Sequence, residues 1–442
     1  MNIKTVILLL LMGMGASAVP AAAAYPLRQE ILDWLEKFAT ATTRDAAMGA
    51  ISSEDVEKLS PYLPPGLIEE FAFTELHMEV VGTQTYAPHD IYQRVTMQYV
   101  GQATLATDGG LENYAAGLPF NHEQILAATL DEAGLMVAWN NIHRWQYNGY
   151  KTDELVMNYM RPISAGASGT LLEGFSGGGH IDRYISQSYY RVYLSHLASR
   201  AGNDFRVDTD DSDRLYWKDY MEYWEPFDLK GTKFIIERSI DPHEGDQVNS
   251  YLPKERRVRR LSARERADSF LGSNYSLDDF EGFSGQVLDF DWTYLGRKAI
   301  LSVSNSRESP ARFHGPYSRL PEDRWQIRQC FVVEHRPKWT GHPISSKIMF
   351  VDEETYNVVL ALIFDHDDAL WKSIVMMYRR PGDAADQSLP ENTLSYWSAS
   401  VAVNYKENDA TVTRAIEPVT FPKFEATQIR RMFSVSNLTG GR

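Results

Sequence analysis

One pentapeptide of the chain has the pattern of a hydrolase nucleophile. Residues 174–178, Gly-Phe-Ser-Gly-Gly, fit the G-x-S-x-G elbow, which presents a serine at a strained turn between a strand and a helix. Only Leu171 and Leu172 precede it as an apolar run, and glycines, which are poor helix formers, stand where the helix should begin. A serine hydrolase that uses Ser176 is therefore the least favoured of the three functions that the sequence leaves open.

The histidines and carboxylates form no recognisable metal motif. His335 and His342 are the closest pair, and His366 lies within an acidic run, but none has the short His/His or Cys/His spacing typical of zinc sites. The acidic runs at 208–213 and 365–368 lack the central glycine and terminal glutamate of a calcium loop. We interpret both runs as solvated turns and expect neither a metal nor another cofactor.

The strongest local charge anomaly is basic. Residues 254–266 carry seven basic side chains against two acidic ones, in a chain whose net charge is −15. Arginine binds phosphate and carboxylate with paired donors, so an anionic headgroup or an acidic partner protein could be bound here. The alternative is an edge strand whose charges prevent sheet-to-sheet aggregation. The candidate contact residues are Arg256, Arg257, Arg259 and Arg260. The acidic balance of the chain argues against nucleic acid as a partner.

The first 24 residues have the pattern of a secretory signal peptide. Lys4 is followed by an apolar run at 6–14 and by the small residues 22–24. The run is shorter than the roughly 20 residues of a membrane-spanning helix. No cysteine follows it, so the acyl attachment point of a lipoprotein is absent. We expect a mature chain that begins near Tyr25 in the periplasm and is soluble or peripherally associated with the outer membrane.

The rest of the chain, 25–442, reads as a single domain of mainly β (α+β) class. The only cysteine, Cys330, excludes an internal disulfide, so the fold must depend on its own core. Residues 25–70 have helical spacing and helix-starting residues, 71–380 have short apolar runs separated by turn residues, and 381–442 form a C-terminal extension. We expect a large curved antiparallel sheet, or an unclosed half-barrel, that helices or a ligand must cover.

The clearest strands form a meander. Runs at 347–352, 357–365 and 370–378 are joined by short polar turns, and a comparable pair occupies 231–238 and 248–253. Alternation along a strand would place one set of side chains on one face of the sheet and a second set on the other. The first set is Val358, Leu360, Leu362 and Phe364, and the second is Val359, Ala361 and Ile363.

Aromatic and large apolar residues are abundant in the β region, which suits either a filled core or an apolar cavity for a ligand. If a cavity exists, its candidate lining residues are Trp217, Trp224, Phe234, Tyr251, Phe280, Trp292, Phe350, Leu362, Phe364 and Trp371.

Several short motifs, taken in this order, resemble a bacterial family known as domain-of-unknown-function family 1329, which is often described as outer-membrane lipoprotein-sorting proteins. The motifs lie at 63–66, 116–120, 138–146, 251–260 and 278–285, and further matches lie at 291–292, 350–352 and 365–371. The resemblance implies a fold similar to the Lol lipoprotein carriers: an unclosed half-barrel with helices over its concave face, where an acyl chain can be bound. It implies no catalytic residues, and it implies association with transporters of the resistance–nodulation–division superfamily.

The sequence thus favours a periplasmic binding or carrier protein for a lipid or another hydrophobic molecule, working with an envelope transporter or an outer-membrane protein. The alternative is a structural adaptor of an envelope transport complex without a ligand of its own. Lipid extraction followed by mass spectrometry would distinguish the two.

Overall fold

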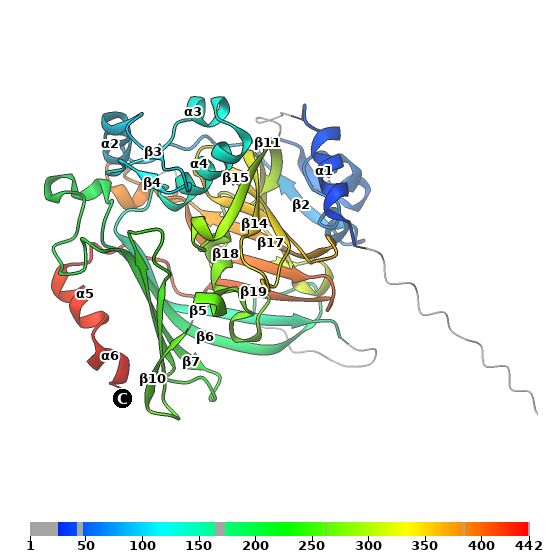
Figure 1. Ribbon diagram of the computed structural model, residues 1–442. Helices are drawn as coiled ribbons and strands as arrows, with labels where there is room; N and C mark the ends of the chain where they lie inside the picture. Colours follow the sequence, from blue (N-terminus) through cyan, green and yellow to red (C-terminus); the bar gives the residue numbers. More distant parts are fainter. Residues whose placement is uncertain (1–24, 42–46, 164–172, 262, 383–384, 441–442) are drawn as a thin grey trace, which may run out of the picture.

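A single large, curved sheet organises the molecule. The computed structural model describes residues 25–41, 47–163, 173–261, 263–382 and 385–440. In Figure 1, α1 and β2 lie at one side of the sheet, α2, α3 and α4 lie above it, and α5 and α6 flank the strands near β7 and β10. The fold is therefore mainly β with peripheral helices, as the sequence predicts.

Fifteen strands form this sheet, in the order β1-β2-β14-β15-β16-β17-β18-β19-β5-β6-β7-β8-β9-β10, with β11 also paired to β14. All pairs are antiparallel except β2 with β14. The two ends of this order, β1 and β10, do not pair with each other within the described ranges, so the sheet is unclosed. The strands are β1 (Gly49–Ser52), β2 (His77–Val80), β5 (Gly149–Arg161), β6 (His180–Tyr193), β7 (Leu215–Glu225), β8 (Lys233–Ser239), β9 (Gln247–Leu252), β10 (Arg257–Leu261), β11 (Phe290–Ser302), β14 (Arg324–Pro337), β15 (Ser346–Asp352), β16 (Val358–Phe364), β17 (Leu370–Arg379), β18 (Tyr396–Asn404) and β19 (Asp409–Ala415).

The helices are short and lie at the margins of the sheet. They are α1 (Arg28–Lys37), α2 (Asp90–Tyr99), α3 (His122–Ala127), α4 (Leu130–Ile142), α5 (Ala426–Met432) and α6 (Val435–Thr439). Two small ribbons, β3 (Thr104–Leu105) with β4 (Leu111–Glu112) and β12 (Phe313–His314) with β13 (Leu320–Pro321), complete the regular strands. Nowhere in the described ranges is a helix both long enough and apolar enough to span a bilayer. The expected signal peptide, 1–24, lies outside the described residues.

The meander is confirmed as β15, β16 and β17, and the second pair as β8 and β9. Two other segments differ from the expected division of the chain. Residues 90–142 hold α2, α3 and α4, with only the two-residue strands β3 and β4 between them, and the C-terminal extension contributes β18 and β19 to the middle of the sheet. Within 25–70, α1 forms as its spacing predicts, but β1 precedes a 3-10 helix, η1 (Ser53–Leu59).

The two faces of β16 do not alternate as simply as its sequence suggests. Phe350 pairs with Leu360, whereas Val351 pairs with Val358, so a bulge at Val359 places Val358 on the opposite face from Leu360. Leu362 remains on the same face as Leu360, because Leu362 pairs with Ile348. The expectation that Val358 shares a face with Leu360 and Leu362 is therefore wrong.

The face that carries Leu360 and Leu362 is covered by the N-terminal residues. Trp34 of α1 contacts Phe350 edge-on, with 6.3 Å between ring centroids. Arg28 of the same helix forms an ion pair of 2.5 Å with Glu334 of β14. This face is a filled interface between α1 and the sheet.

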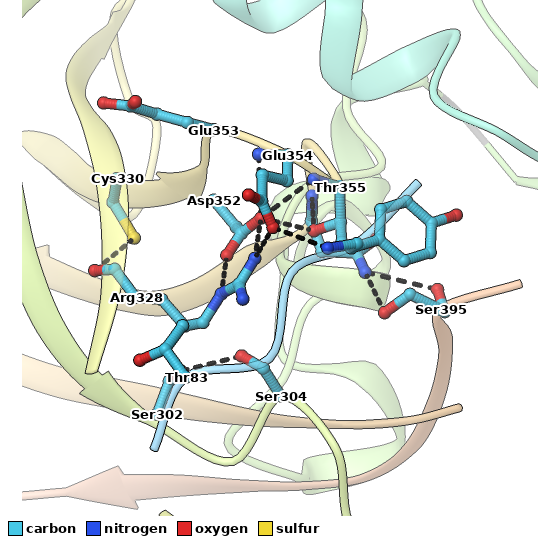
Figure 2. Close-up of polar contacts among 12 residues, drawn as sticks. Thr83, Ser302, Ser304, Arg328, Cys330, Asp352, Glu353, Glu354, Thr355 and Ser395 are labelled. Atoms are coloured by element: carbon cyan, nitrogen blue, oxygen red, sulfur yellow. Dashed lines mark hydrogen bonds and ion pairs between the residues drawn. The ribbon is translucent and has the colours of Figure 1, made fainter. Parts of the chain in front are cut away.

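A buried ion-pair network fixes the turn between β15 and β16 on this side of the sheet (Figure 2). Arg328 of β14 donates to Asp352, and its Nη2 also lies 2.8 Å from Glu354 Oε2. Asp352 Oδ1 in turn accepts from the backbone N–H of Thr355 at 2.8 Å. Arg328 Nη1 also donates to the carbonyl of Gln84 at 2.7 Å, so the network joins the chain after β2 to the sheet. Its role is structural.

Candidate functional site

The concave face of the sheet is crossed by one irregular segment, residues 263–289, which we call the strap. It consists of four short 3-10 turns, η4 (Ala263–Ala267), η5 (Phe270–Gly272), η6 (Leu277–Gly282) and η7 (Val287–Asp289). Phe270 of the strap contacts Phe234 of β8 with ring centroids 5.7 Å apart, whereas Gly282 lies against Val358 of β16. The strap therefore touches both halves of the curved sheet.

The middle of the strap is tied to β15 by a buried lysine. Lys347 Nζ lies 2.7 Å from Asp279 Oδ1 and donates to the Gly282 carbonyl at 2.7 Å. Burial alone would raise the pKa of Asp279, but the ammonium of Lys347 outweighs it and lowers that pKa below its ordinary value. Asp279 is therefore ionised at neutral pH.

Two residues further on, a second carboxylate joins the strap to the other half of the sheet. Glu281 accepts from Arg144, which follows α4, and from the phenol of Tyr150 in β5. Arg191 Nη1 of β6 lies 3.8 Å from Glu281 Oε1. Burial would raise the pKa of Glu281, but the two guanidinium groups outweigh it and lower that pKa. Glu281 itself has a left-handed backbone, with φ of +51°, a conformation that is uncommon outside glycine.

The start of the strap is held by a third cluster. Arg266 Nε donates to Asp278 Oδ1 at 2.9 Å, and Arg266 Nη1 lies 2.7 Å from Asp246 Oδ2. Arg238 of β8 also pairs with Asp246 and donates from Nη1 to the Gly285 carbonyl at 3.0 Å. All three clusters are buried, so the strap is fastened largely by charge-assisted bonds and by a few aromatic contacts.

A small apolar pocket lies between the strap and the β5–β6 half of the sheet. It has a volume of about 50 Å³ and is lined chiefly by apolar and aromatic side chains. From the sheet come Leu155, Met157, Tyr189, Met376 and Trp397, and from the strap Tyr275 and Phe280. This space is well below the roughly 300 Å³ at which small-molecule sites begin, so nothing as large as an acyl chain fits while the strap is in place.

A larger, polar pocket of about 330 Å³ lies on the other side of the strap. It is bounded by β15, β16 and β17, by the turn after β18, and by strap residues from Ala267 to Phe283. Lys347, Lys372, His335 and His342 line it, and Asp279 lines both pockets. The strap thus separates an apolar space from a polar one.

The predicted cavity residues are distributed over several environments. Phe280 lines the apolar pocket, Trp371 lines the polar pocket, and Phe234 reaches Phe280 through Phe270. Trp292 contacts strap residue Phe283 at 5.1 Å. Trp217 is buried beneath Arg191 and Arg238, and Tyr251 packs beside Tyr220 and Ile235. Phe350, Leu362 and Phe364 are fully buried in the core. Trp224 is 43% exposed.

The four predicted contact arginines lie together at the end of the sheet. Arg257, Arg259 and Arg260 belong to β10, the terminal strand, and Arg256 precedes it in a left-handed conformation. All four are exposed. Arg259 pairs with Glu255 at 2.6 Å. This placement fits the edge-strand interpretation, and it also leaves Arg256, Arg257 and Arg260 exposed to a partner.

The pentapeptide around Ser176 does not form a nucleophile elbow. Residues 174–178 form a loop, and Phe175 makes a bridge to Phe313 of β12. Ser176 Oγ donates to the Phe313 carbonyl at 3.4 Å. In the part of the chain that the structure covers, no group of three or more His, Cys, Asp or Glu side chains is arranged to hold a metal ion.

Sequence reasoning missed the side chains that fasten the strap. Lys347 does not stand out in sequence. Arg144 lies within the motif at 138–146 and Arg266 within the basic run at 254–266, but neither pattern identifies the carboxylate that the arginine binds. Arg144 and Glu281, for example, are 137 residues apart. The motif at 278–285 likewise contains the partner carboxylates Asp278, Asp279 and Glu281.

The architecture defines the class of protein: an unclosed antiparallel half-barrel with a segment inserted against its concave face. Residues 50–439 match the family described as protein of unknown function (DUF1329), and the chain belongs to that family. No curated protein matches the chain.

Three solved structures are similar to it in fold. A DUF1329 family protein from Desulfovibrio piger has 16% identity and a TM-score of 0.45, covering 70% of this chain and 100% of its own. A domain from Vibrio parahaemolyticus, assigned provisionally to outer-membrane lipoprotein sorting, has 16% identity and a TM-score of 0.42, covering 68% and 97%. A LolA superfamily protein from Nitrosomonas europaea has 9% identity and a TM-score of 0.37, with the same coverage of 68% and 97%.

Proposed function

We propose that this protein is a periplasmic carrier that binds a lipid or another hydrophobic molecule between the strap and the concave face of the sheet. The observation that carries the proposal is the strap itself: a segment of short turns inserted between two halves of an unclosed sheet, with an apolar pocket beneath it. A covering segment of this kind can leave without unfolding any strand. The signal-peptide pattern at 1–24 supports the location.

The way in which the strap is fastened favours reversible opening. Its buried ion pairs, such as Lys347 with Asp279, give up hydration when they form and regain it when the strap opens. Opening of the strap exposes Phe270 and Phe280 and uncovers the part of the sheet against which they pack. An apolar cargo would cover that part of the sheet. Rehydration of the ion pairs and coverage of the exposed apolar surface by cargo both lower the free-energy cost of opening the strap.

The binding free energy would come from removing the cargo's apolar surface from water. Burying each CH₂ group contributes roughly 0.8 kcal/mol, so a chain of about 16 carbons contributes on the order of 10 kcal/mol before ordering and strap opening are subtracted. That margin is compatible with loading from one partner, such as an envelope transporter of the resistance–nodulation–division type, and release to another in the outer membrane.

Native mass spectrometry of protein purified gently from the periplasm tests the proposal. We expect a mass adduct that organic extraction removes and identifies as a lipid, and we expect delipidated protein to take up a fluorescent fatty acid. Protein that carries no extractable lipid and takes up no probe would contradict the carrier function.

A second function, adaptor to an anionic surface, is favoured by one observation. The terminal strand β10 presents Arg257, Arg259 and Arg260 to solvent. Replacing Arg257 and Arg260 by glutamate should weaken co-sedimentation with phosphatidylglycerol vesicles at low salt, with little effect on stability because exposed charges contribute little. The control with the same charge change is Lys58→Glu with Arg336→Glu, which are also exposed. Equal loss in both pairs would assign the effect to net charge alone.

A further inference from the structure

Among the described residues that line the polar pocket beside the strap, one lysine, Lys372, is not held in an ion pair. Apart from Glu407, the pocket's other charged side chains are paired: Lys347 with Asp279 at 2.7 Å, and Arg161 Nη1 with Asp409 at 3.2 Å. Asp278 is paired with Arg266 at 2.9 Å, and Glu407 is exposed at the rim. Among the described residues Lys372 has no ion pair.

Lys372 is held in place by neutral groups. Its Nζ donates to the carbonyl of Asn274 in the strap at 3.2 Å, and it lies 4.2 Å from the ring centroid of Trp371. Burial lowers the pKa of Lys372, whereas the carboxylates of Asp279 and Asp409 raise it, and the net pKa is below that of an ordinary lysine. An ammonium that has lost hydration without gaining a carboxylate is stabilised by any anion that enters the pocket.

Two histidines in the same pocket have unused hydrogen-bonding capacity. His335 is 2% exposed, and neither its Nδ1 nor its Nε2 has a hydrogen-bond partner in the part of the chain that the structure describes. His342 is 6% exposed, and its Nδ1 accepts from the Ile344 N–H while its Nε2 has no partner. Buried polar groups are almost always hydrogen-bonded, so these ring nitrogens are available to a water or to a ligand atom that enters the pocket. A neutral imidazole offers one N–H donor, which suits an oxygen acceptor.

We propose that the polar pocket binds an anionic group, a carboxylate or a phosphate, with Lys372 supplying the charge and the rings of His342 and His335 supplying hydrogen bonds. The volume of about 330 Å³ is at the low end of the range for small-molecule sites, which suits a headgroup. If this anionic group is one end of the cargo, the inference rests on the proposed carrier function. The two pockets adjoin, because Asp279 of the strap borders both. A single amphipathic molecule can then place its chain under the strap and its anion beside Lys372.

The test compares two ligands with the same chain and different heads. Wild-type protein, delipidated, should bind palmitate at least tenfold more tightly than hexadecanol, because a hydrogen bond to a charged group contributes about 1.5–3 kcal/mol. Lys372→Met, which keeps the apolar stem and removes the charge, should abolish this preference. Lys372→Arg should retain it.

Lys406→Met is the matched control. Lys406 Nζ lies 5.5 Å from the same Trp371 ring, but it is paired with Asp365 at 2.5 Å and does not line the polar pocket. Its replacement should leave the palmitate preference intact. Thermal unfolding of each variant shows whether the fold survives. If Lys372→Met does not fold, Lys372→Gln replaces it.

The outcomes separate this inference from the carrier function. Equal binding of palmitate and hexadecanol overturns the anion site and leaves the carrier function standing. If neither palmitate nor hexadecanol binds, the carrier function is overturned. Titration with inorganic phosphate then shows whether the polar pocket still binds an anion. Phosphate binding that Lys372→Met removes supports a site for a free anion, whereas absence of phosphate binding overturns the pocket as well.

Discussion

Lys347 Nζ lies 2.7 Å from Asp279 Oδ1, and both side chains are buried where the strap meets β15. The same ammonium donates to the Gly282 carbonyl. One side chain of the sheet therefore holds the strap at two points, and its removal should affect the strap before it affects the strands.

Replacing Lys347 by methionine should destabilise the protein by about 3–5 kcal/mol, because the Asp279 carboxylate is left buried without a partner. Urea denaturation measures the loss, and hydrogen exchange in the strap should quicken more than exchange in β15. The double variant with Asp279→Leu should recover part of the stability, since it also removes the orphaned charge. A single variant within 1 kcal/mol of wild type would show that the pair does not hold the strap.

Locking the strap to the sheet should block cargo uptake. Asn274 N of the strap lies 3.0 Å from Thr411 Oγ1 of β19, so these neighbouring positions are chosen for a pair of cysteines, whose disulfide is verified by thiol titration. The oxidised double variant should take up a fluorescent fatty acid more slowly or not at all, and reduction should restore uptake.

The native cysteine does not complicate this experiment. Cys330 is fully buried, and burial raises the pKa of its thiol well above the ordinary value, so it is unreactive. Each single cysteine variant serves as a control for the substitutions themselves. Uptake by the oxidised protein at the wild-type rate would mean that cargo enters without strap movement.

Stability should decrease as the pH falls below about 6.5, the ordinary pKa of histidine. Burial lowers the pKa of His335 well below that value, and the nearby charges of Lys347 and His342 lower it further. Below this pH the unfolded chain takes up a proton at His335 that the folded chain does not. Each unit by which the pH is lowered therefore decreases the free energy of unfolding by up to about 1.4 kcal/mol for this residue. His335 packs against Phe283 and Phe290, and phenylalanine has a ring of similar shape. His335→Phe should therefore remove the contribution of this residue to the pH dependence of the free energy of unfolding. Urea denaturation at a series of pH values measures it. An unchanged slope would mean that His335 is protonated in the folded protein.

Tryptophan substitutions at two neighbouring residues of β16 should have different effects, one on stability and the other on ligand binding. Leu362 is fully buried on the face toward α1 and lines neither pocket, so Leu362→Trp should cost about 1–3 kcal/mol of stability without changing ligand binding. Ile363 lines the polar pocket, so Ile363→Trp should fill part of it and weaken palmitate binding. Thermal unfolding and equilibrium binding distinguish the two. Reduced binding in Leu362→Trp would place the cargo on the wrong face for this proposal.

The sequence predicts a strand or helix correctly where its local pattern of apolar and polar residues matches the environment of that element in the folded protein. The strands of the meander are visible because β16 is apolar on both faces and polar turns bound it. The helix α4 is missed because it is nearly apolar all round, without a polar stripe to mark its period, and Gly134 within it packs against the backbone of Trp292 and Thr293. The bulge at Val359 leaves no trace in sequence and reverses the face of Val358.

The candidate site was less accessible to sequence reasoning than the fold. Large aromatic residues were the reasonable candidates for a cavity, but most of them fill the core, as large apolar side chains usually do. The strap has neither a helical nor a strand period. Its partners Arg144, Lys347 and Asp409 come from three separate parts of the chain, so only the tertiary structure brings them together.

The position of the last two strands bears on how the polypeptide matures. β18 and β19 join β17 to β5, and β19 pairs with β5 across about 250 residues, from Met160 to Ala410. A nascent chain can assemble β5–β10 and β14–β17 as two sheet fragments, but each keeps a bare edge until the ribosome has added residue 415. The molecule thus becomes one sheet only late in synthesis. That delay lengthens the period during which the two bare edges are open to pairing with strands of other chains.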